Sequence, residues 1–153
     1  MGIRLNKFIA TAGGIGYIPL APGTWAALVF CTIWFFTIKF FPAIYTWQLI
    51  LIPLFVFTGV YCSGKIVNEK VKDPNYIVID EMAGMFVTLI FIPPSLINFI
   101  AGFILFRFFD IVKPLGIRKM EQFRKGWGIM LDDILAGIYS AIALRLLIVM
   151  KIW

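Results

Sequence analysis

The sequence predicts an all-α fold, an integral membrane helical bundle of about five spans, on three observations. Hydrophobic residues make up 61% of the 153 residues, and charged residues make up only 14%. A soluble domain has roughly 45–50% apolar and about 25% charged residues, so one small core cannot hide this excess. The apolar residues also fall into runs separated by short polar or Pro/Gly-rich segments. Residues 1–153 are therefore expected to form a single membrane domain.

The beginning of the chain predicts an N-terminal surface helix, a loop and a first span. Residues 3–12 have an amphipathic pattern that suits the membrane surface. Residues 13–24 contain four glycines and two prolines, which indicates a Gly/Pro-rich entry loop instead of a regular helix. Residues 25–41 form an apolar run that is long enough for the first span.

The remaining spans are predicted from four apolar runs. These runs cover residues 43–64, 77–93, 95–112 and 128–153. Pro53 is expected to kink the first of them, and Pro93-Pro94 are expected to end the second. Several runs are at the short end of the roughly 17–25 residues that a span requires, so their boundaries are expected only to within a few residues.

The positive charges predict the orientation of these spans. With five spans, three basic segments fall on one side of the membrane: Arg4 and Lys7; Lys65, Lys70 and Lys72; and Lys113, Arg118, Lys119, Arg124 and Lys125. The positive-inside rule puts that side in the cytoplasm. The net charge of +6 then faces anionic lipid headgroups. Nucleic acid is not expected as a partner, because no basic stretch carries a known nucleic-acid module.

Five of the eight acidic residues lie at the cytoplasmic ends of three different predicted spans. They are Asp80, Glu81, Asp110, Asp132 and Asp133. The other three, Glu69, Asp73 and Glu121, are interpreted as solvated surface charges. Five clustered carboxylates repel one another unless cations intervene. Hard oxygen ligands suit Mg²⁺, with Mn²⁺ or Ca²⁺ as alternatives, and a chain without histidine does not suit zinc.

Small and basic residues beside the acids are consistent with a packed site. Ala83-Gly84 and Ala136-Gly137 follow the two acid pairs and allow helices to approach closely. Arg107, Asp110 and Lys113 are spaced three residues apart on one helix face. This spacing fits two interpretations equally well. One is a structural ladder of ion pairs, and the other is an acidic ligand between two anion-binding groups.

The segment APGT, residues 21–24, leads directly into the first span. Thr24 is a candidate N-cap, so this region is expected to present free backbone N–H groups at a helix start. Such a start binds anions in some proteins and is a plain helix cap in others.

The missing residue types exclude several kinds of catalysis. Without histidine there is no His-nucleophile phosphatase and no Ser-His-Asp hydrolase. Neither Cys31 nor Cys62 is followed six residues later by arginine, so a cysteine phosphate loop is absent. Metal-assisted hydrolysis of a phosphate ester remains. The leading alternative is an ion or proton transporter, although such proteins place acids near mid-membrane and often repeat their spans.

Four sequence blocks resemble the signature blocks of the phosphatidylglycerophosphatase A family. They are YIPLAPGTWAAL (17–28), VIDEMAG (78–84), FILFRFFDIVKPLGI (103–117) and GIMLDDILAG (128–137). The resemblance implies a multi-pass enzyme of the bacterial inner membrane whose active site faces the cytoplasm. It would hydrolyse the terminal phosphate of phosphatidylglycerophosphate to give phosphatidylglycerol, with Mg²⁺ as cofactor.

The resemblance also implies roles for individual residues. The family's motif acids, implied to be catalytic and metal-binding, map onto Asp80, Glu81, Asp110, Asp132 and Asp133. Its basic and entry motifs map onto Arg107, Lys113, Pro22, Gly23 and Thr24. Phosphate oxygens would bind to Arg107, Lys113 and the Gly23-Thr24 region, and Glu81 is our hypothesis for the carboxylate that activates water.

Overall fold

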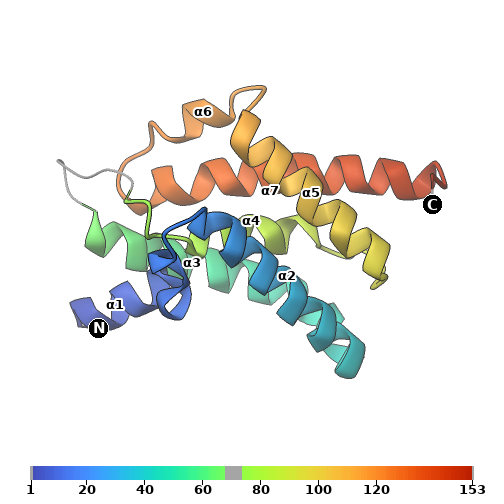
Figure 1. Cartoon of the computed structure of the whole chain (residues 1–153), viewed down its shortest axis with the longest axis horizontal. Helices are drawn as coiled ribbons and strands as arrows, with labels where there is room; N and C mark the ends of the chain where they lie inside the picture. Colours follow the sequence, from blue (N-terminus) through green and yellow to red (C-terminus); the bar gives the residue numbers. More distant parts are fainter. Residues whose placement is uncertain (1, 68–73, 153) are drawn as a thin grey trace.

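The computed structural model describes residues 2–67 and 74–152, and all regular secondary structure in them is helical (Figure 1). In chain order the elements are α1 (Ile3–Ala10), η1 (Ala12–Tyr17), α2 (Pro22–Phe40), η2 (Pro42–Trp47), α3 (Gln48–Ile66), α4 (Ile79–Thr88), α5 (Leu96–Val112), α6 (Ile117–Met120) and α7 (Gly126–Val149). The all-α prediction is confirmed for the described residues. The predictions for Glu69, Lys70, Lys72 and Asp73 lie outside them.

The entry region is more helical than its composition predicts. Gly13 and Gly14 have φ angles of 69° and 106°, which glycine adopts without strain, and they interrupt the 3₁₀ segment η1. Helix α2 begins at Pro22, and its N-cap is Ala21. Proline suits the first helical position because its φ is already fixed. The prediction that Thr24 is the N-cap is therefore wrong, since Thr24 lies within the first turn.

Two helical stretches among the described residues are long and apolar enough to cross a membrane. They are Pro22–Phe40, with a mean hydropathy of 1.4, and Pro42–Ile66, with a mean hydropathy of 1.8. They correspond to the first two predicted spans. The second stretch contains η2 and α3, and Pro53 lies inside α3.

Helix α4 is much shorter than the predicted span over residues 77–93. It has 10 residues, which at 1.5 Å per residue is about 15 Å, half of a hydrocarbon core of roughly 30 Å. A turn over residues 89–91 ends it before the two prolines, and Phe91 has a φ of 51°. Helix α4 packs against α2, α3, α5 and α7, so it lies at the centre of the bundle (Figure 1).

Backbone groups of the irregular segment after α4 are hydrogen-bonded to side chains from three other helices. These are Gln48 Oε1, which accepts from Phe91 N–H at 2.7 Å; Arg145 Nη2, which donates to the Ile90 carbonyl at 2.7 Å; and Asn98 Nδ2, which donates to the Pro93 carbonyl at 2.9 Å. Side chains thus replace the hydrogen bonds that a longer helix would have made internally.

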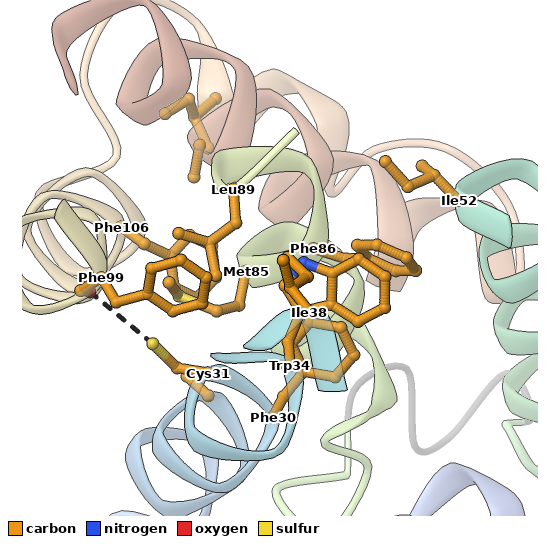
Figure 2. Packing of buried hydrophobic residues seen from close by; sticks show 13 residues of the cluster. Phe30, Cys31, Trp34, Ile38, Ile52, Met85, Phe86, Leu89, Phe99 and Phe106 are labelled. Carbon is orange, nitrogen blue, oxygen red and sulfur yellow. Dashed lines mark hydrogen bonds between the residues drawn. The ribbon is translucent and has the colours of Figure 1, made fainter. Parts of the chain in front are cut away.

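Aromatic packing fixes α4 against α2. The rings of Trp34 and Phe86 lie 4.6 Å apart, and the rings of Phe30 and Phe86 lie 5.1 Å apart (Figure 2). All three side chains are buried. Such contacts stabilise an aromatic pair by about 0.5–1.5 kcal/mol beyond the burial of its area. They fix the position of α4 on α2, and two of the acids lie in the first turn of α4.

Small residues bring α4 and α7 together, as predicted. A Cβ added at Gly84 would lie 2.6 Å from the Asp133 carbonyl oxygen, and one added at Gly137 would clash with the Gly84 carbonyl. Only glycine permits this approach of the two backbones. The crossing therefore places the acid pair of α4 beside the acid pair of α7.

Candidate metal and phosphate site

Three acidic side chains from α4 and α7 converge at the centre of the bundle. Asp80 and Glu81 lie in the first turn of α4, and Asp133 lies in the second turn of α7. One carboxylate oxygen of each residue lies within 4.8 Å of those of the other two. The positive end of the α4 dipole favours negative charge at this turn. We call Asp80, Glu81 and Asp133 the acid triad.

The other two predicted acids border the acid triad. The carboxyl of Asp133 interacts electrostatically with Asp110, Glu81 and Asp132. Asp110 ends α5, and Asp132 precedes Asp133 on α7. Both are at least nine-tenths buried. The structure thus gathers all five predicted acids, although only three approach closely enough to share one ion.

Two side chains of the acid triad each have a buried oxygen that is open to a ligand. Glu81 Oε2 and Asp133 Oδ2 are buried and have no hydrogen-bond partner within residues 2–67 and 74–152. A buried carboxylate needs an ion pair, a proton or a metal to offset its desolvation. The donor set is purely hard oxygen and offers one atom from each of three side chains, so these residues fit a divalent cation such as Mg²⁺ or Mn²⁺.

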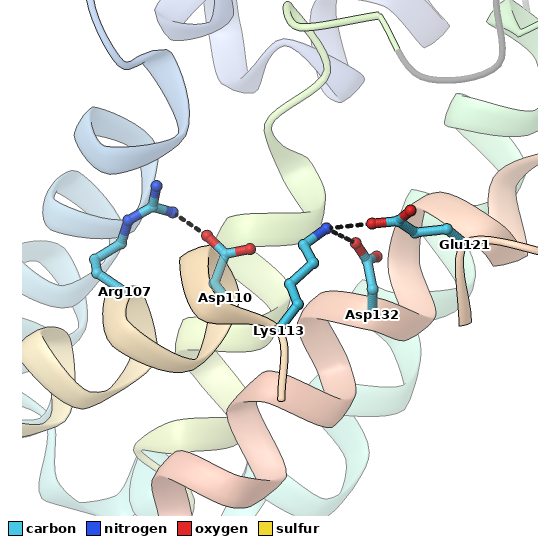
Figure 3. Close-up of polar contacts among 5 residues, drawn as sticks. All are labelled: Arg107, Asp110, Lys113, Glu121 and Asp132. Carbon is cyan, nitrogen blue, oxygen red and sulfur yellow. Dashed lines mark hydrogen bonds and ion pairs between the residues drawn. The ribbon is translucent and has the colours of Figure 1, made fainter. Parts of the chain in front are cut away.

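Two cations pair with the bordering acids (Figure 3). Arg107 Nη1 lies 2.6 Å from Asp110 Oδ2 on the same helix. Lys113 Nζ lies 2.6 Å from Asp132 Oδ2 and 2.8 Å from Glu121 Oε1. One step of the predicted ladder, from Arg107 to Asp110, is present. Lys113 instead leaves the α5 helix in a left-handed conformation, with a φ of 47°, and its side chain bridges to α7.

The ion pair between Glu121 and Lys113 is a contact that the sequence did not reveal. It was expected to be a solvated charge, and its side chain is indeed 50% exposed, but it shares Lys113 with the buried Asp132. Lys113 and Glu121 are eight positions apart across a turn and the short helix α6, so no helical periodicity connects them.

Lys113 remains a cation in this environment. Burial opposes its charge, yet the hydrogen bonds from its ammonium group to Asp132 and Glu121 raise the pKa of Lys113 above its usual range. A lysine that holds its proton this firmly cannot act as a general base near neutral pH. It can hold Asp132 in place and attract an anion.

Arg107 has binding capacity beyond its ion pair. Its Nε atom is buried without a hydrogen-bond partner in the described part of the chain. The guanidinium also interacts electrostatically with Glu81 of the acid triad. A cationic donor beside such a group of acids is the arrangement that a metal-bound phosphate would require, since guanidinium groups bind phosphate oxygens through charge-assisted hydrogen bonds.

The start of α2 touches the acid triad directly. A Cβ added at Gly23 would clash with Glu81 Oε1, so a larger residue at this position would displace the Glu81 carboxylate. Trp25 N–H bonds to the Ala21 carbonyl at 3.3 Å, and the N–H groups of Gly23 and Thr24 precede this helical ladder. The sequence left open whether this helix start binds an anion or is a plain cap, and it did not reveal the contact with Glu81, because the two segments lie far apart in the chain.

The chain is similar to known proteins over most of its length. A sequence model of the phosphatidylglycerophosphatase A family matches residues 8–148. A Bacteroides thetaiotaomicron protein named "Putative phosphatidylinositol-3-phosphatase" is 43% identical over 144 residues, which cover 90% of this chain and 90% of that protein. No solved structure matches the chain significantly.

Two further bacterial relatives carry the family's name. The phosphatidylglycerophosphatase A of Escherichia coli is 37% identical over 138 residues, which cover 87% of this chain and 77% of that protein. The phosphatidylglycerophosphatase A of Haemophilus influenzae is 39% identical over 142 residues, with coverages of 88% and 83%.

Proposed function

The chain belongs to the phosphatidylglycerophosphatase A family, and we propose that it hydrolyses the terminal phosphomonoester of phosphatidylglycerophosphate to phosphatidylglycerol and phosphate. The observation that carries this proposal is the acid triad beside Arg107 and Lys113. Clustered carboxylates suit a divalent cation, and the adjacent cations suit the phosphate that such an ion would bind. The reaction would be a step in glycerophospholipid synthesis.

A second substrate is supported by one relative. The Bacteroides protein that shares 43% identity is named for phosphatidylinositol 3-phosphate, which is also a phosphomonoester on a membrane lipid. The two headgroups present the same phosphate chemistry and differ in the alcohol that carries it. The acid triad and the two cations serve either substrate, so only a direct comparison of rates separates them.

The proposed mechanism assigns a task to each group of residues. Asp80, Glu81 and Asp133 would hold Mg²⁺, or Mn²⁺ as a substitute, and Asp110 and Asp132 stay predicted as further catalytic and metal-binding acids. A bound Mg²⁺ supplies Lewis-acid stabilisation of negative charge on phosphate oxygens. We assign Glu81 to orient and deprotonate the attacking water, because one of its oxygens is buried without a partner among the described residues.

The cations and the α2 start would bind the phosphate itself. Arg107 Nε offers a donor without a partner in the described residues, and Lys113 remains positively charged. The N–H groups of Gly23 and Thr24 lie at the beginning of α2, beside Glu81. Together they would stabilise the charge that develops as the ester bond to the leaving alcohol breaks, and that alcohol takes up a proton.

We place the chain as a single domain in the bacterial inner membrane, with five membrane-crossing segments and the site facing the cytoplasm. Apolar side chains are exposed on α2, α3, α5 and α7, as expected for surfaces in contact with lipid. The short α4 and the turn after it would form the third crossing. Irregular backbone is tolerated at membrane depth where protein surrounds it, as it does here.

The ends of the bundle support this orientation. In Figure 1, α1, the end of α3, α6 and the beginning of α7 lie toward one end, and the C-terminus lies at the other. Basic residues of α1, α3 and α6 therefore share a side, as the positive-inside argument requires. Helix α1 exposes Ile3, Leu5 and Phe8, which suits a helix lying on the membrane surface.

Phosphate release from lipid micelles tests the proposal. The purified chain is expected to release phosphate from phosphatidylglycerophosphate faster than from phosphatidylinositol 3-phosphate, and EDTA is expected to abolish both activities. A faster rate with the inositol lipid would transfer the assignment to the second substrate. Absence of phosphate release from either lipid, together with cation flux in proteoliposomes, would favour the alternative of an ion or proton transporter.

A further inference from the structure

An apolar groove of about 500 Å³ runs between α2 and α5 on the outside of the bundle. Its two walls consist of side chains spaced four residues apart, so each wall is one face of one helix. The walls are Leu28, Thr32 and Phe36 on α2, and Leu96, Ile100 and Ile104 on α5. All six side chains are exposed, which leaves the groove open along its length.

The floor of the groove is a contact between the same two helices. Cys31 Sγ donates to the Phe99 carbonyl at 3.6 Å (Figure 2), and the rings of Phe35 and Phe99 lie 5.1 Å apart. Cys31 and Phe99 are buried. A contact between buried groups fixes the separation of α2 and α5, so the groove is part of the fold and does not depend on the open wall side chains.

One end of the groove lies close to the candidate site along both of its helices. Leu28 lies one turn beyond Thr24 on α2, and Ile104 lies three residues before Arg107 on α5. One helical turn is about 5.4 Å. The groove therefore begins within a turn of two groups to which we assign phosphate binding, and it runs away from them toward Phe36 and Leu96.

The length of the groove matches one lipid leaflet. Leu96 and Ile104, the two ends of the wall on α5, are eight positions apart, which is about 12 Å at 1.5 Å per residue. One leaflet of hydrocarbon is about 15 Å deep, half of a core of roughly 30 Å. A chain lying in the groove with its headgroup at the site would therefore reach most of the way to the bilayer midplane.

We propose that this groove binds an acyl chain of the phospholipid whose phosphate occupies the site. The inference rests on the proposed function and adds to it a site for the apolar part of the substrate. Hydrocarbon leaves one apolar environment for another, so the groove gains packing contacts and not hydrophobic transfer energy. Its effect is to orient the lipid, because a chain held between α2 and α5 directs the headgroup toward Arg107 and Gly23.

A tryptophan placed in the groove tests the proposal. Thr32→Trp would fill the middle of the groove from its exposed wall, and Ile33→Trp is the matched control, because Ile33 is adjacent, 57% exposed and outside the groove. The probes are phosphatidylglycerophosphate in micelles and its deacylated water-soluble headgroup. We expect Thr32→Trp to lower kcat/KM for the lipid about tenfold while changing that for the headgroup less than twofold. Ile33→Trp is expected to change neither more than twofold.

Other outcomes separate this proposal from the proposed function. An equal loss of activity on lipid and headgroup by Thr32→Trp, or an unaltered rate on both, would overturn the groove assignment and leave the phosphatase assignment intact. A wild-type chain that hydrolyses neither probe would overturn the proposed function, and this inference with it.

Photo-crosslinking of the wild-type chain gives a readout that needs no variant. A phosphatidylglycerophosphate probe with a diazirine in the middle of one acyl chain is expected to label residues 28–36 and 96–104 above the rest of the surface. Unlabelled phosphatidylglycerophosphate should compete for this labelling, whereas an excess of phosphatidylcholine should not. Labelling spread evenly over α2, α3, α5 and α7 would show that bulk lipid occupies the groove and would contradict the proposal.

Discussion

Two polar clusters in this apolar molecule satisfy their hydrogen-bonding groups differently. Around the turn after α4, Gln48, Asn98 and Arg145 each bond to a backbone group of the irregular segment. There, the Nε2 atom of Gln48 is the buried side-chain atom without a partner among the described residues. In the acid triad, buried oxygens of Glu81 and Asp133 have no hydrogen-bond partner in the part of the chain that the structure describes, and like charges face one another.

The difference separates a structural role from a binding role. A polar group that completes a hydrogen bond in an apolar environment stabilises the fold. A cluster whose acceptors remain open lowers stability until a cation or substrate arrives, and such groups mark functional sites. Substitutions at the turn should therefore affect stability, and substitutions at the acid triad should affect activity.

The largest effect is expected from neutralising the acid triad. Asp80→Asn and Asp133→Asn should each lower kcat about a hundredfold or more, because each removes a charged ligand from the proposed metal site. Thermal stability should be unchanged or higher, because repulsion among the acids decreases. Phosphate release and circular dichroism melting measure the two effects. Near-full turnover by both variants would contradict the assigned roles.

A smaller loss of activity is expected at the start of α2. Gly23→Ala adds a methyl group where Glu81 Oε1 lies, so the carboxylate must move away from the cluster. Displacing a reacting group by about 1 Å can cost about a hundredfold in rate, and we expect a loss between tenfold and a hundredfold. Gly2→Ala, at a position with open space around it, serves as the control. Equal rates in both variants would show that Glu81 needs no fixed position.

At the turn after α4, the expected change is in stability. Gln48→Leu leaves the partly buried N–H of Phe91 without its acceptor, which should cost about 1 kcal/mol of unfolding free energy. Activity per folded molecule should stay within twofold. Denaturant titration and phosphate assays on the same preparation measure both quantities, and Leu49→Ala, at a side chain that is 64% exposed, is the control. A loss of turnover without a loss of stability would break the proposed separation of roles.

The smallest effect is expected at Glu121. Its side chain is half exposed, and Lys113 keeps Asp132 when Glu121 is neutralised. Glu121→Gln should change kcat/KM less than about twofold, since exposed ion pairs contribute only 0–1 kcal/mol. Lys113→Gln, measured in parallel, should reduce kcat/KM more strongly because it removes the cation beside Asp132. Equal effects of the two substitutions on kcat/KM would contradict the proposed role of Lys113 in phosphate binding.

The sequence predicted the helical class, the first two spans and the small-residue crossing, because apolar runs and glycine pairs are local signals. It predicted a third span where the structure has the short α4. The acids at the start of this predicted span and the prolines at its end are visible in the sequence. The side chains of Gln48, Asn98 and Arg145, which allow the helix to end early, come from distant segments.

For the candidate site, the sequence predicted five acids at one depth. It could not separate the acids that lie close enough to share an ion from the acids that pair with cations. Which acids share an ion depends on the α4–α7 crossing, and which acids pair with cations depends on the backbone of Lys113. The contact between Gly23 and Glu81 joins segments almost sixty residues apart, and no periodicity links them. For the polar cluster at the turn after α4, the local signal in the sequence is the presence of amide residues, such as Gln48 and Asn98, within apolar runs.

The central claim is that the acid triad holds a divalent cation. Electron paramagnetic resonance of Mn²⁺ titrated into the detergent-purified chain tests it directly, with Asp133→Asn and the remote Gln48→Leu as paired variants. The account predicts Mn²⁺ binding that Mg²⁺ displaces, that survives Gln48→Leu and that Asp133→Asn weakens at least about tenfold. Equal Mn²⁺ binding by the wild-type chain and Asp133→Asn, or no Mn²⁺ binding by a chain that releases phosphate in the presence of EDTA, would contradict it.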